Sequence, residues 1–282
     1  MYFSAMTRQE LVQRIKTKKS YLCVGLDPDL SKIPAHLRSS KDPVYEFNMR
    51  IIDATREFCV AYKPNTAFYE CLGIQGWECF EKTLRYIGSD HLTIADAKRG
   101  DMGNTATMYA KAFFEIYNAD AITLNPYLGK DSIAPFLAYE NKWSILLALT
   151  SNAGSMDFQL SEILHPVTGR EEKLFEQVIH TSSQWAGPDQ MMYVVGATHP
   201  DLLKHIREMI PEHFLLVPGV GAQGGDLQAI SEAGLNSDCG LLVNSSRQII
   251  YASSGKDFAQ KAGEEAKKVQ QEMEMLLETV LS

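Results

Sequence analysis

Short apolar runs alternate with longer amphipathic stretches along the whole chain. Eight of these runs predict buried parallel strands, over residues 21–27, 59–63, 92–98, 121–125, 145–150, 192–197, 214–218 and 240–244. Apolar residues at helical spacing predict helices over residues 43–58, 75–87, 105–118, 132–139, 171–185, 200–209, 227–233 and 259–281. Eight strands, each followed by a helix, favour an α/β fold of the (β/α)8 or TIM-barrel class. A doubly wound open sheet is the main alternative.

The length of the chain, 282 residues, fits a single barrel domain. We therefore expect one domain over residues 1–282. A short N-terminal helix is expected over about residues 7–18, because Thr7-Arg-Gln-Glu10 has the spacing of a capping box. Two excursions from the repeat, residues 28–42 and 152–169, lengthen the loops after the first and fifth strands. Loops at the carboxyl ends of barrel strands commonly shape a binding site.

Composition and charge disfavour several classes of function. The net charge of -8 argues against broad nucleic-acid binding, although it is compatible with a basic pocket for a small anion. No apolar run is long enough to cross a bilayer, and residues 1–19 lack the features of a signal peptide, so no membrane partner is expected. The five cysteines include no C-x-x-C pair, which favours buried free thiols and a cytoplasmic protein. The seven histidines show no paired spacing, so no metal site is expected.

The segment Asp96-Ala-Lys98-Arg-Gly-Asp101 carries the most informative polar residues, directly after the third apolar run. Residues two apart on a strand point the same way, so Asp96 and Lys98 are expected to share a face at the strand's carboxyl end. Barrel enzymes hold their catalytic groups at that end. A structural ion pair is the alternative, but a buried pair adds little stability compared with apolar packing, so we favour a catalytic role. Thr105, four residues after Asp101, is either an ordinary first-turn residue or a second hydroxyl contact.

Polar residues also end the first, second and fifth strands. Asp27 either accepts two hydrogen bonds from a sugar diol or forms a turn with the proline after it. Lys63 is either buried among carboxylates or exposed at a rim. Ser151 lies in a cluster of small hydrogen-bonding residues, which suits the edge of a flat heterocycle or simple turn chemistry.

A phosphate site is predicted at the seventh and eighth strands. The glycine-rich segment 218–226, which contains Gln223, precedes a helix, so its backbone amides can close on an anion. Arg247 follows the eighth strand. A glycine-rich seventh loop beside an arginine after the eighth strand is where barrels commonly bind phosphate.

Together these segments resemble the orotidine 5′-phosphate decarboxylase family over nearly the whole chain. The core of the resemblance is D-A-K-R-G-D at 96–101, which matches the family's D-x-K-x-x-D. The flanking matches are G-L-D-P-D at 25–29, Y-K-P-N at 62–65, T-S-N at 150–152, P-G-V-G-A-Q-G-G-D at 218–226 and Arg247. The two long loops are typical of the longer of the bacterial subfamilies. Ala153 departs from that subfamily, which usually has proline after T-S-N.

The resemblance implies a carboxy-lyase that converts orotidine 5′-monophosphate (OMP) to UMP and CO2, the last step of de novo pyrimidine biosynthesis, without cofactor or metal. It implies that Lys98 protonates C6 of the pyrimidine and that Asp96 lies beside the substrate carboxylate. Lys63 and Asp101 would complete an alternating array of charges. The resemblance also implies a homodimer with shared active sites, into which Asp101 and Thr105 reach from the other subunit.

Binding roles are implied as well. By the resemblance, Asp27 binds the ribose hydroxyls and Ser151 the pyrimidine, while Gln223 and Arg247 bind the phosphate. Two other functions share parts of this pattern. Magnesium-dependent decarboxylases or aldolases of the same barrel superfamily, which act on sugar phosphates, also carry D-x-K-x-x-D, and a catalytically silent barrel would bind nucleotides without turnover. The T-S-N segment and the Gln223 loop favour the pyrimidine nucleotide.

Overall fold

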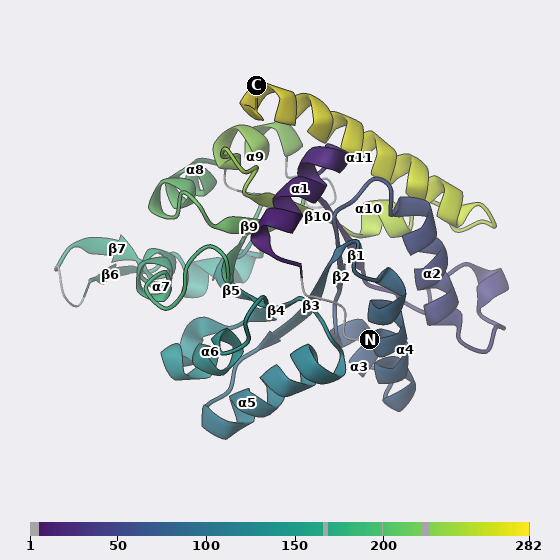
Figure 1. Ribbon diagram of the computed structural model, residues 1–282, viewed down its shortest axis with the longest axis horizontal. Helices are drawn as coiled ribbons and strands as arrows, with labels where there is room; N and C mark the ends of the chain where they lie inside the picture. Colours follow the sequence, from purple (N-terminus) through teal and green to yellow (C-terminus); the bar gives the residue numbers. More distant parts are fainter. Residues whose placement is uncertain (1–5, 166–168, 199, 221–225, 282) are drawn as a thin grey trace.

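Eight parallel strands close into a barrel in the computed structural model, which describes residues 6–165, 169–198, 200–220 and 226–281 (Figure 1). Their order around the barrel is β1-β10-β9-β8-β5-β4-β3-β2. The strands are β1 Leu22–Leu26, β2 Ala61–Pro64, β3 Leu92–Arg99, β4 Ala121–Leu124, β5 Trp143–Leu149, β8 Met191–Val195, β9 Phe214–Pro218 and β10 Leu241–Ser245. The predicted barrel is confirmed, and the predicted strand ends differ from these by at most two residues.

Helices surround the barrel on its outer side (Figure 1). They are α1 Arg8–Lys18, α2 Pro43–Thr55, α3 Ala67–Glu70, α4 Ile74–Ile87, α5 Gly103–Lys111, α6 Lys130–Leu137, α7 Leu174–Ser182, α8 Pro200–Met209, α9 Leu227–Gly234, α10 Arg247–Ile250 and α11 Phe258–Leu281. Helix α5 continues into a π-helical segment, Ala112–Ile116. Short 3-10 helices lie at Ala35–Leu37, Pro126–Leu128 and Ala153–Asp157. Within the described part of the chain, no helix is both long enough and apolar enough to span a membrane.

The excursion after β5 contains an antiparallel hairpin, formed by β6 Glu162–Leu164 and β7 Glu171–Lys173. The predicted helix over residues 171–185 is therefore wrong at its start. Residues Glu171–Lys173 pair with Glu162–Leu164, and α7 begins only at Leu174. This pairing is invisible to helical periodicity, because β6 lies outside the periodic segment.

The barrel strands form the centre of the hydrophobic core. Every residue of β1, β2, β8 and β10 is buried, as expected for parallel strands that are covered on both faces. All five cysteines are free thiols, and of these only Cys71 is exposed. Charged side chains within these strands therefore stand out, and the buried ones are Lys63 in β2 and Asp96 in β3.

Helix α1 covers the amino-terminal end of the barrel. The predicted capping box is present, because Thr7 caps the helix and the Glu10 side chain returns to the Thr7 backbone. Leu11 and Ile15 on the inner face of α1 are fully buried. The helix thus shields the core at the end of the barrel opposite the predicted site.

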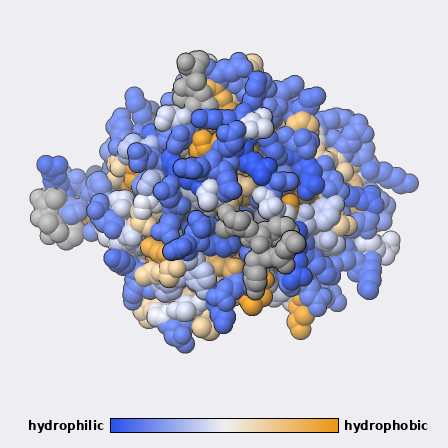
Figure 2. All heavy atoms as spheres, viewed as in Figure 1, coloured by the Kyte–Doolittle hydropathy of each residue, from blue (hydrophilic) through white to orange (hydrophobic). Residues whose placement is uncertain are grey.

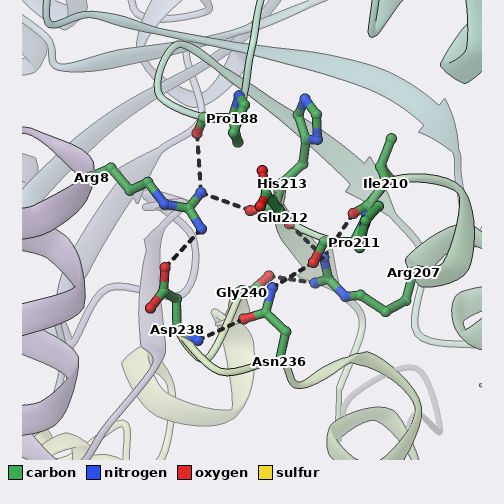
Figure 3. Close-up of polar contacts among 10 residues, drawn as sticks. All are labelled: Arg8, Pro188, Arg207, Ile210, Pro211, Glu212, His213, Asn236, Asp238 and Gly240. Atoms are coloured by element: carbon green, nitrogen blue, oxygen red, sulfur yellow. Dashed lines mark hydrogen bonds and ion pairs between the residues drawn. The ribbon is translucent and has the colours of Figure 1, made fainter.

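Two arginines bind backbone carbonyls at the amino ends of β8, β9 and β10 (Figure 3). Arg8 donates to the carbonyl oxygens of Glu212 at 2.7 Å and Pro188 at 3.3 Å, and it pairs with Asp238 at 3.0 Å. The buried guanidinium of Arg207 donates to five carbonyl oxygens, those of Ile210, Pro211, His213, Gly234 and Gly240. These bonds fasten α1 and α8 to the amino end of the barrel.

Candidate active site

Asp96 lies between two ammonium groups at the carboxyl end of the barrel. Its Oδ2 atom is 2.6 Å from Lys63 Nζ, and its Oδ1 atom is 2.5 Å from Lys98 Nζ. Lys63 comes from β2, whereas Asp96 and Lys98 come from β3. The side chains of Lys63 and Asp96 are only 6% and 9% exposed, but that of Lys98 is 49% exposed. Lys63 is therefore buried together with the carboxylate, whereas Lys98 contacts the carboxylate from the solvent-exposed side.

Lys98 reaches Asp96 through a distortion of β3 rather than by regular strand alternation. Its backbone φ is +46°, in the left-handed region, and the register between β3 and β4 shifts between Ala95 and Arg99. A non-glycine residue in that conformation costs roughly 1–2 kcal/mol. Such strain concentrates at functional sites, where the surrounding structure holds it in place.

The charges of this cluster support one another. Burial alone would lower the pKa of Lys63, but the carboxylates of Asp96 and Asp27 outweigh it and raise that pKa above its usual value. Burial alone would raise the pKa of Asp96, but Lys63 and Lys98 hold it well below its usual range. Lys63 and Asp96 therefore stay charged at neutral pH, as a buried ion pair.

Thr123 of β4 also belongs to this cluster, although it was not predicted from the sequence. Its hydroxyl donates to Asp96 Oδ1 at 3.0 Å and accepts from the backbone N–H of Lys98 at 2.9 Å. A threonine is common in strands, so its type gives no signal. Its place in the fourth apolar run, two residues before that predicted strand ends, is the only hint that the sequence contains.

Asp27 lies just beyond β1, beside the Lys63 strand. Gly25 pairs in register with Lys63, and the Ser246 hydroxyl donates to Asp27 Oδ2 at 2.6 Å. The other carboxylate oxygen of Asp27 and the Oδ1 atom of Asn244 are buried and have no hydrogen-bond partner among the described residues. Two unsatisfied buried acceptors at adjoining strand ends are a ready site for hydroxyl donors, because leaving them unpaired is costly.

The remaining predicted residues occupy the rim. Arg247 is exposed at the start of α10, directly after Ser246. Ser151 follows β5 and lies against Gly196 after β8, where an added Cβ would be 2.6 Å from the Ser151 nitrogen. Gln223 lies outside the described residues.

Asp101 and Thr105 are not brought into the cluster within one chain. Thr105 is exposed on α5, and the partly exposed Asp101 accepts a hydrogen bond from the Met102 N–H at 2.8 Å. The structure describes both residues and shows no hydrogen bond or ion pair from either to Asp96 or its lysines. Among the described residues, no group of three His, Cys, Asp or Glu side chains is placed to hold a metal ion.

Comparisons with known proteins identify the family of this chain. The family model described as "Orotidine 5'-phosphate decarboxylase / HUMPS family" matches residues 20–262. Curated proteins named orotidine 5′-phosphate decarboxylase are similar over nearly the whole chain. One from Phocaeicola vulgatus is 55% identical and covers 96% of this chain and 99% of its own, and one from Flavobacterium johnsoniae is 57% identical and covers 97% and 99%.

A solved structure of Leishmania donovani UMP synthase superposes with a TM-score of 0.79 at 37% identity. The match covers 94% of this chain, which spans 57% of the length of that protein. Both the family match and the curated relatives extend over the segments that supply Lys63, Asp96 and Lys98. The chain therefore belongs to the orotidine 5′-phosphate decarboxylase / HUMPS family.

Proposed function

We infer that the chain catalyses the decarboxylation of OMP to UMP and CO2, the last step of de novo pyrimidine biosynthesis. Curated relatives that are more than half identical over nearly the full chain carry the decarboxylase name. The observation that carries the chemistry is the pair of lysines that flanks Asp96 at the carboxyl end of the barrel. The sugar-phosphate alternative is not favoured, because these relatives are named for the nucleotide reaction.

Loss of CO2 from C6 leaves an electron pair in the plane of the pyrimidine ring, where it cannot delocalise into the π system. The site must therefore stabilise negative charge electrostatically. A cation fixed about 4 Å from such a charge contributes roughly 4 kcal/mol at an effective dielectric constant of about 20. In the proposed mechanism the Lys98 ammonium, held against Asp96, supplies this charge and transfers its proton to C6 as the C–C bond breaks.

Asp96 has two parts in this proposal. Its carboxylate aims the Lys98 ammonium, and it also faces the carboxylate of bound OMP. Because Lys63 and Lys98 keep Asp96 ionised, it repels the substrate carboxylate, and the repulsion is relieved as neutral CO2 departs. Lys63 keeps the buried Asp96 charge compensated throughout.

The rim residues are proposed to bind the rest of the nucleotide. Asp27, whose Oδ1 atom is buried and unpaired among the described residues, accepts from the ribose hydroxyls. Ser151 contacts the pyrimidine edge, while Arg247 and Gln223 hold the phosphate. Remote binding energy of this kind raises the rate when it is used to position the reacting groups.

The proposed assembly is a homodimer in which Asp101 and Thr105 enter the site of the other subunit. Exposed large apolar side chains lie just before α5, on α5, on its π-helical extension and after β4, namely Met102, Met108, Ile116, Tyr127 and Leu128. Figure 2 shows a mostly hydrophilic face with hydrophobic residues gathered toward its lower edge, the side on which α5 lies in Figure 1. A surface of this composition suits contact with a second copy.

The free thiols support a cytoplasmic location.

The test is the ultraviolet absorbance change of OMP on addition of purified protein in excess EDTA, with Lys98→Ala assayed in parallel. Conversion to UMP by the wild type, with loss of turnover in the variant, is the expected result. The proposal would be overturned if OMP persisted while a sugar phosphate was consumed on addition of magnesium. If Lys98→Ala turned over OMP at the wild-type rate, Lys98 could not be the proton donor.

A further inference from the structure

A single buried hydroxyl joins the two central groups of the site. Thr123 Oγ1 accepts from the Lys98 backbone N–H at 2.9 Å and donates to Asp96 Oδ1 at 3.0 Å. Thr123 is only 1% exposed, so bulk water does not compete for either bond. Val would match this side chain in shape but make neither bond.

The two hydrogen bonds of Thr123 orient one another. A hydroxyl carries one hydrogen, and since Oγ1 accepts from the Lys98 amide, that hydrogen is available to Asp96. The same Asp96 oxygen receives the Lys98 ammonium at 2.5 Å. The contacts therefore form a closed ring, from the Lys98 amide through Thr123 and Asp96 to the Lys98 ammonium, which fixes both ends of the lysine.

We propose that Thr123 is a positioning residue for the decarboxylation. It holds the Lys98 backbone in its left-handed turn and fixes the carboxylate against which the Lys98 ammonium is aimed. This inference rests on the proposed function, because it gives Thr123 a part only through Lys98 and Asp96. Small displacements of a reacting group lower the rate steeply, so loss of this ring should appear in turnover before it appears in binding.

The same strand pair provides a matched control at its opposite end. Thr93 Oγ1 accepts from the Asp120 backbone N–H at 2.9 Å and donates to Asp120 Oδ2 at 2.7 Å, and Thr93 is 4% exposed. By the same chemistry, Thr93 links β3 to Asp120 just before β4, and Thr123 links β4 to Asp96 and Lys98 of β3. Thr93 lies near the start of β3, whereas Thr123 contacts its carboxyl end.

The experiment compares Thr123→Val, Thr123→Ser and Thr93→Val in steady-state turnover of OMP and in calorimetric binding of UMP. For Thr123→Val we expect kcat to fall roughly 10- to 100-fold, with KM for OMP and Kd for UMP within about twofold of wild type. Thr123→Ser keeps the hydroxyl and should retain kcat within about threefold. Thr93→Val should lower the melting temperature and leave kcat unchanged.

Wild-type kcat in Thr123→Val would overturn the proposal, as would a parallel loss of kcat and UMP binding, which indicates general disruption of the site. A serine variant as slow as the valine variant would also contradict it. If Thr123→Val does not fold, Thr123→Ala against Thr123→Ser makes the same comparison. Two further results separate this inference from the function on which it rests. An inactive Lys98→Ala beside a fully active Thr123→Val refutes the role of Thr123 alone, whereas failure of the wild-type protein to convert OMP refutes the proposed function.

Discussion

Asp96 combines deep burial with full ionisation because both of its oxygens meet an ammonium group. Lys63 and Lys98 lie 2.6 Å and 2.5 Å from the two oxygens, and the net effect holds the pKa of Asp96 well below its usual range. An isolated buried carboxylate would instead become neutral. The pair of lysines therefore keeps a negative charge where the proposed mechanism needs one.

Replacing Asp96 by Asn tests the need for that charge. The amide keeps the shape but leaves Lys63 buried without its nearest counter-ion, and it no longer aims Lys98 by charge. We expect kcat for OMP to fall at least about 100-fold and the free energy of unfolding to drop by roughly 3 kcal/mol. Turnover is measured on protein shown to be folded by circular dichroism.

Asp120→Asn is the matched control for this prediction. Asp120 is also a buried aspartate, 9% exposed, but it lies at the amino end of β4 and bonds to Thr93. Its substitution should lower stability while kcat stays within about twofold of wild type, since it lies away from the reacting groups. Equal losses of kcat in the two variants would contradict a special role for Asp96.

At the residue scale, the sequence predicts which side chains lie near the site, but it does not predict all the contacts between them. Lys63 and Asp96 come together because each ends an apolar run, and the carboxyl ends of neighbouring parallel strands share one end of a barrel. The contribution of Thr123 and the left-handed backbone of Lys98 depend on the register shift between β3 and β4. That shift is a tertiary feature without a local sequence signature. The roles of these residues in catalysis stay predictions.

At the scale of single elements, α8 is anchored by one side chain. The guanidinium of Arg207 donates to five backbone carbonyls, that of Gly234 at the end of α9 and four just before β9 and β10, which Figure 3 shows. Lysine has one ammonium and cannot reproduce this planar array of donors. We expect Arg207→Lys to lower the free energy of unfolding by roughly 3 kcal/mol, because several buried carbonyls lose their donors.

Urea denaturation measures this loss, and OMP turnover below the unfolding transition serves as its control. The site lies at the other end of the barrel, so kcat should remain within about twofold of wild type. An unfolding free energy within 1 kcal/mol of wild type, roughly the worth of one hydrogen bond, would show that the carbonyls find other donors.

Strands and helices could be predicted from the sequence where the apolar pattern of each one is contained within its own segment. Each barrel strand is a short apolar run between turn residues, and all eight were placed within two residues of their ends. The hairpin of β6 and β7 was not, because Glu171–Lys173 is polar and its strand conformation depends on pairing with Glu162–Leu164. Its sequence continues the pattern of the helix that follows, which is why the predicted helix begins too early.

At the scale of the whole molecule, two buried histidines make stability depend on pH. Burial and the nearby Lys18 lower the pKa of His91 to about 4, and burial likewise lowers that of His213 to about 4. The usual value is about 6.5, so between these limits the unfolded chain binds more protons than the folded one. The free energy of unfolding should therefore decrease as the pH falls from about 6.5 toward 4.

Each histidine should account for about 2 kcal/mol of lost stability between pH 7 and pH 5. Urea unfolding at the two pH values measures the drop, and His91→Gln should make it smaller by about that amount. His91 contacts Lys18 Nζ at 2.8 Å, at the amino-terminal end of the barrel, so turnover at pH 7 provides a control that should not change. An identical pH dependence in the variant would show that His91 takes up its proton as readily in the folded chain as in the unfolded one.

The proposed shared sites can be tested only in the assembled molecule. Asp101 makes no hydrogen bond or ion pair with Lys98 within one chain, and in a shared site the two residues come from different subunits. Lys98→Ala and Asp101→Asn should each be nearly inactive alone. In a mixed dimer, one site carries both substitutions and the other carries neither. Random mixing should therefore restore roughly one quarter of wild-type activity per chain, since about half of the dimers are mixed and each has one intact site.

Dissociation and reassociation of the two purified variants, followed by OMP turnover, measures this recovery. Each variant taken alone through the same treatment is the control. If Lys98 and Asp101 acted within one chain, no combination of subunits would contain an intact site and the mixture would stay inactive. Recovery therefore distinguishes a shared site from a site complete in each barrel, and it does so through two residues that no hydrogen bond or ion pair joins within a single chain.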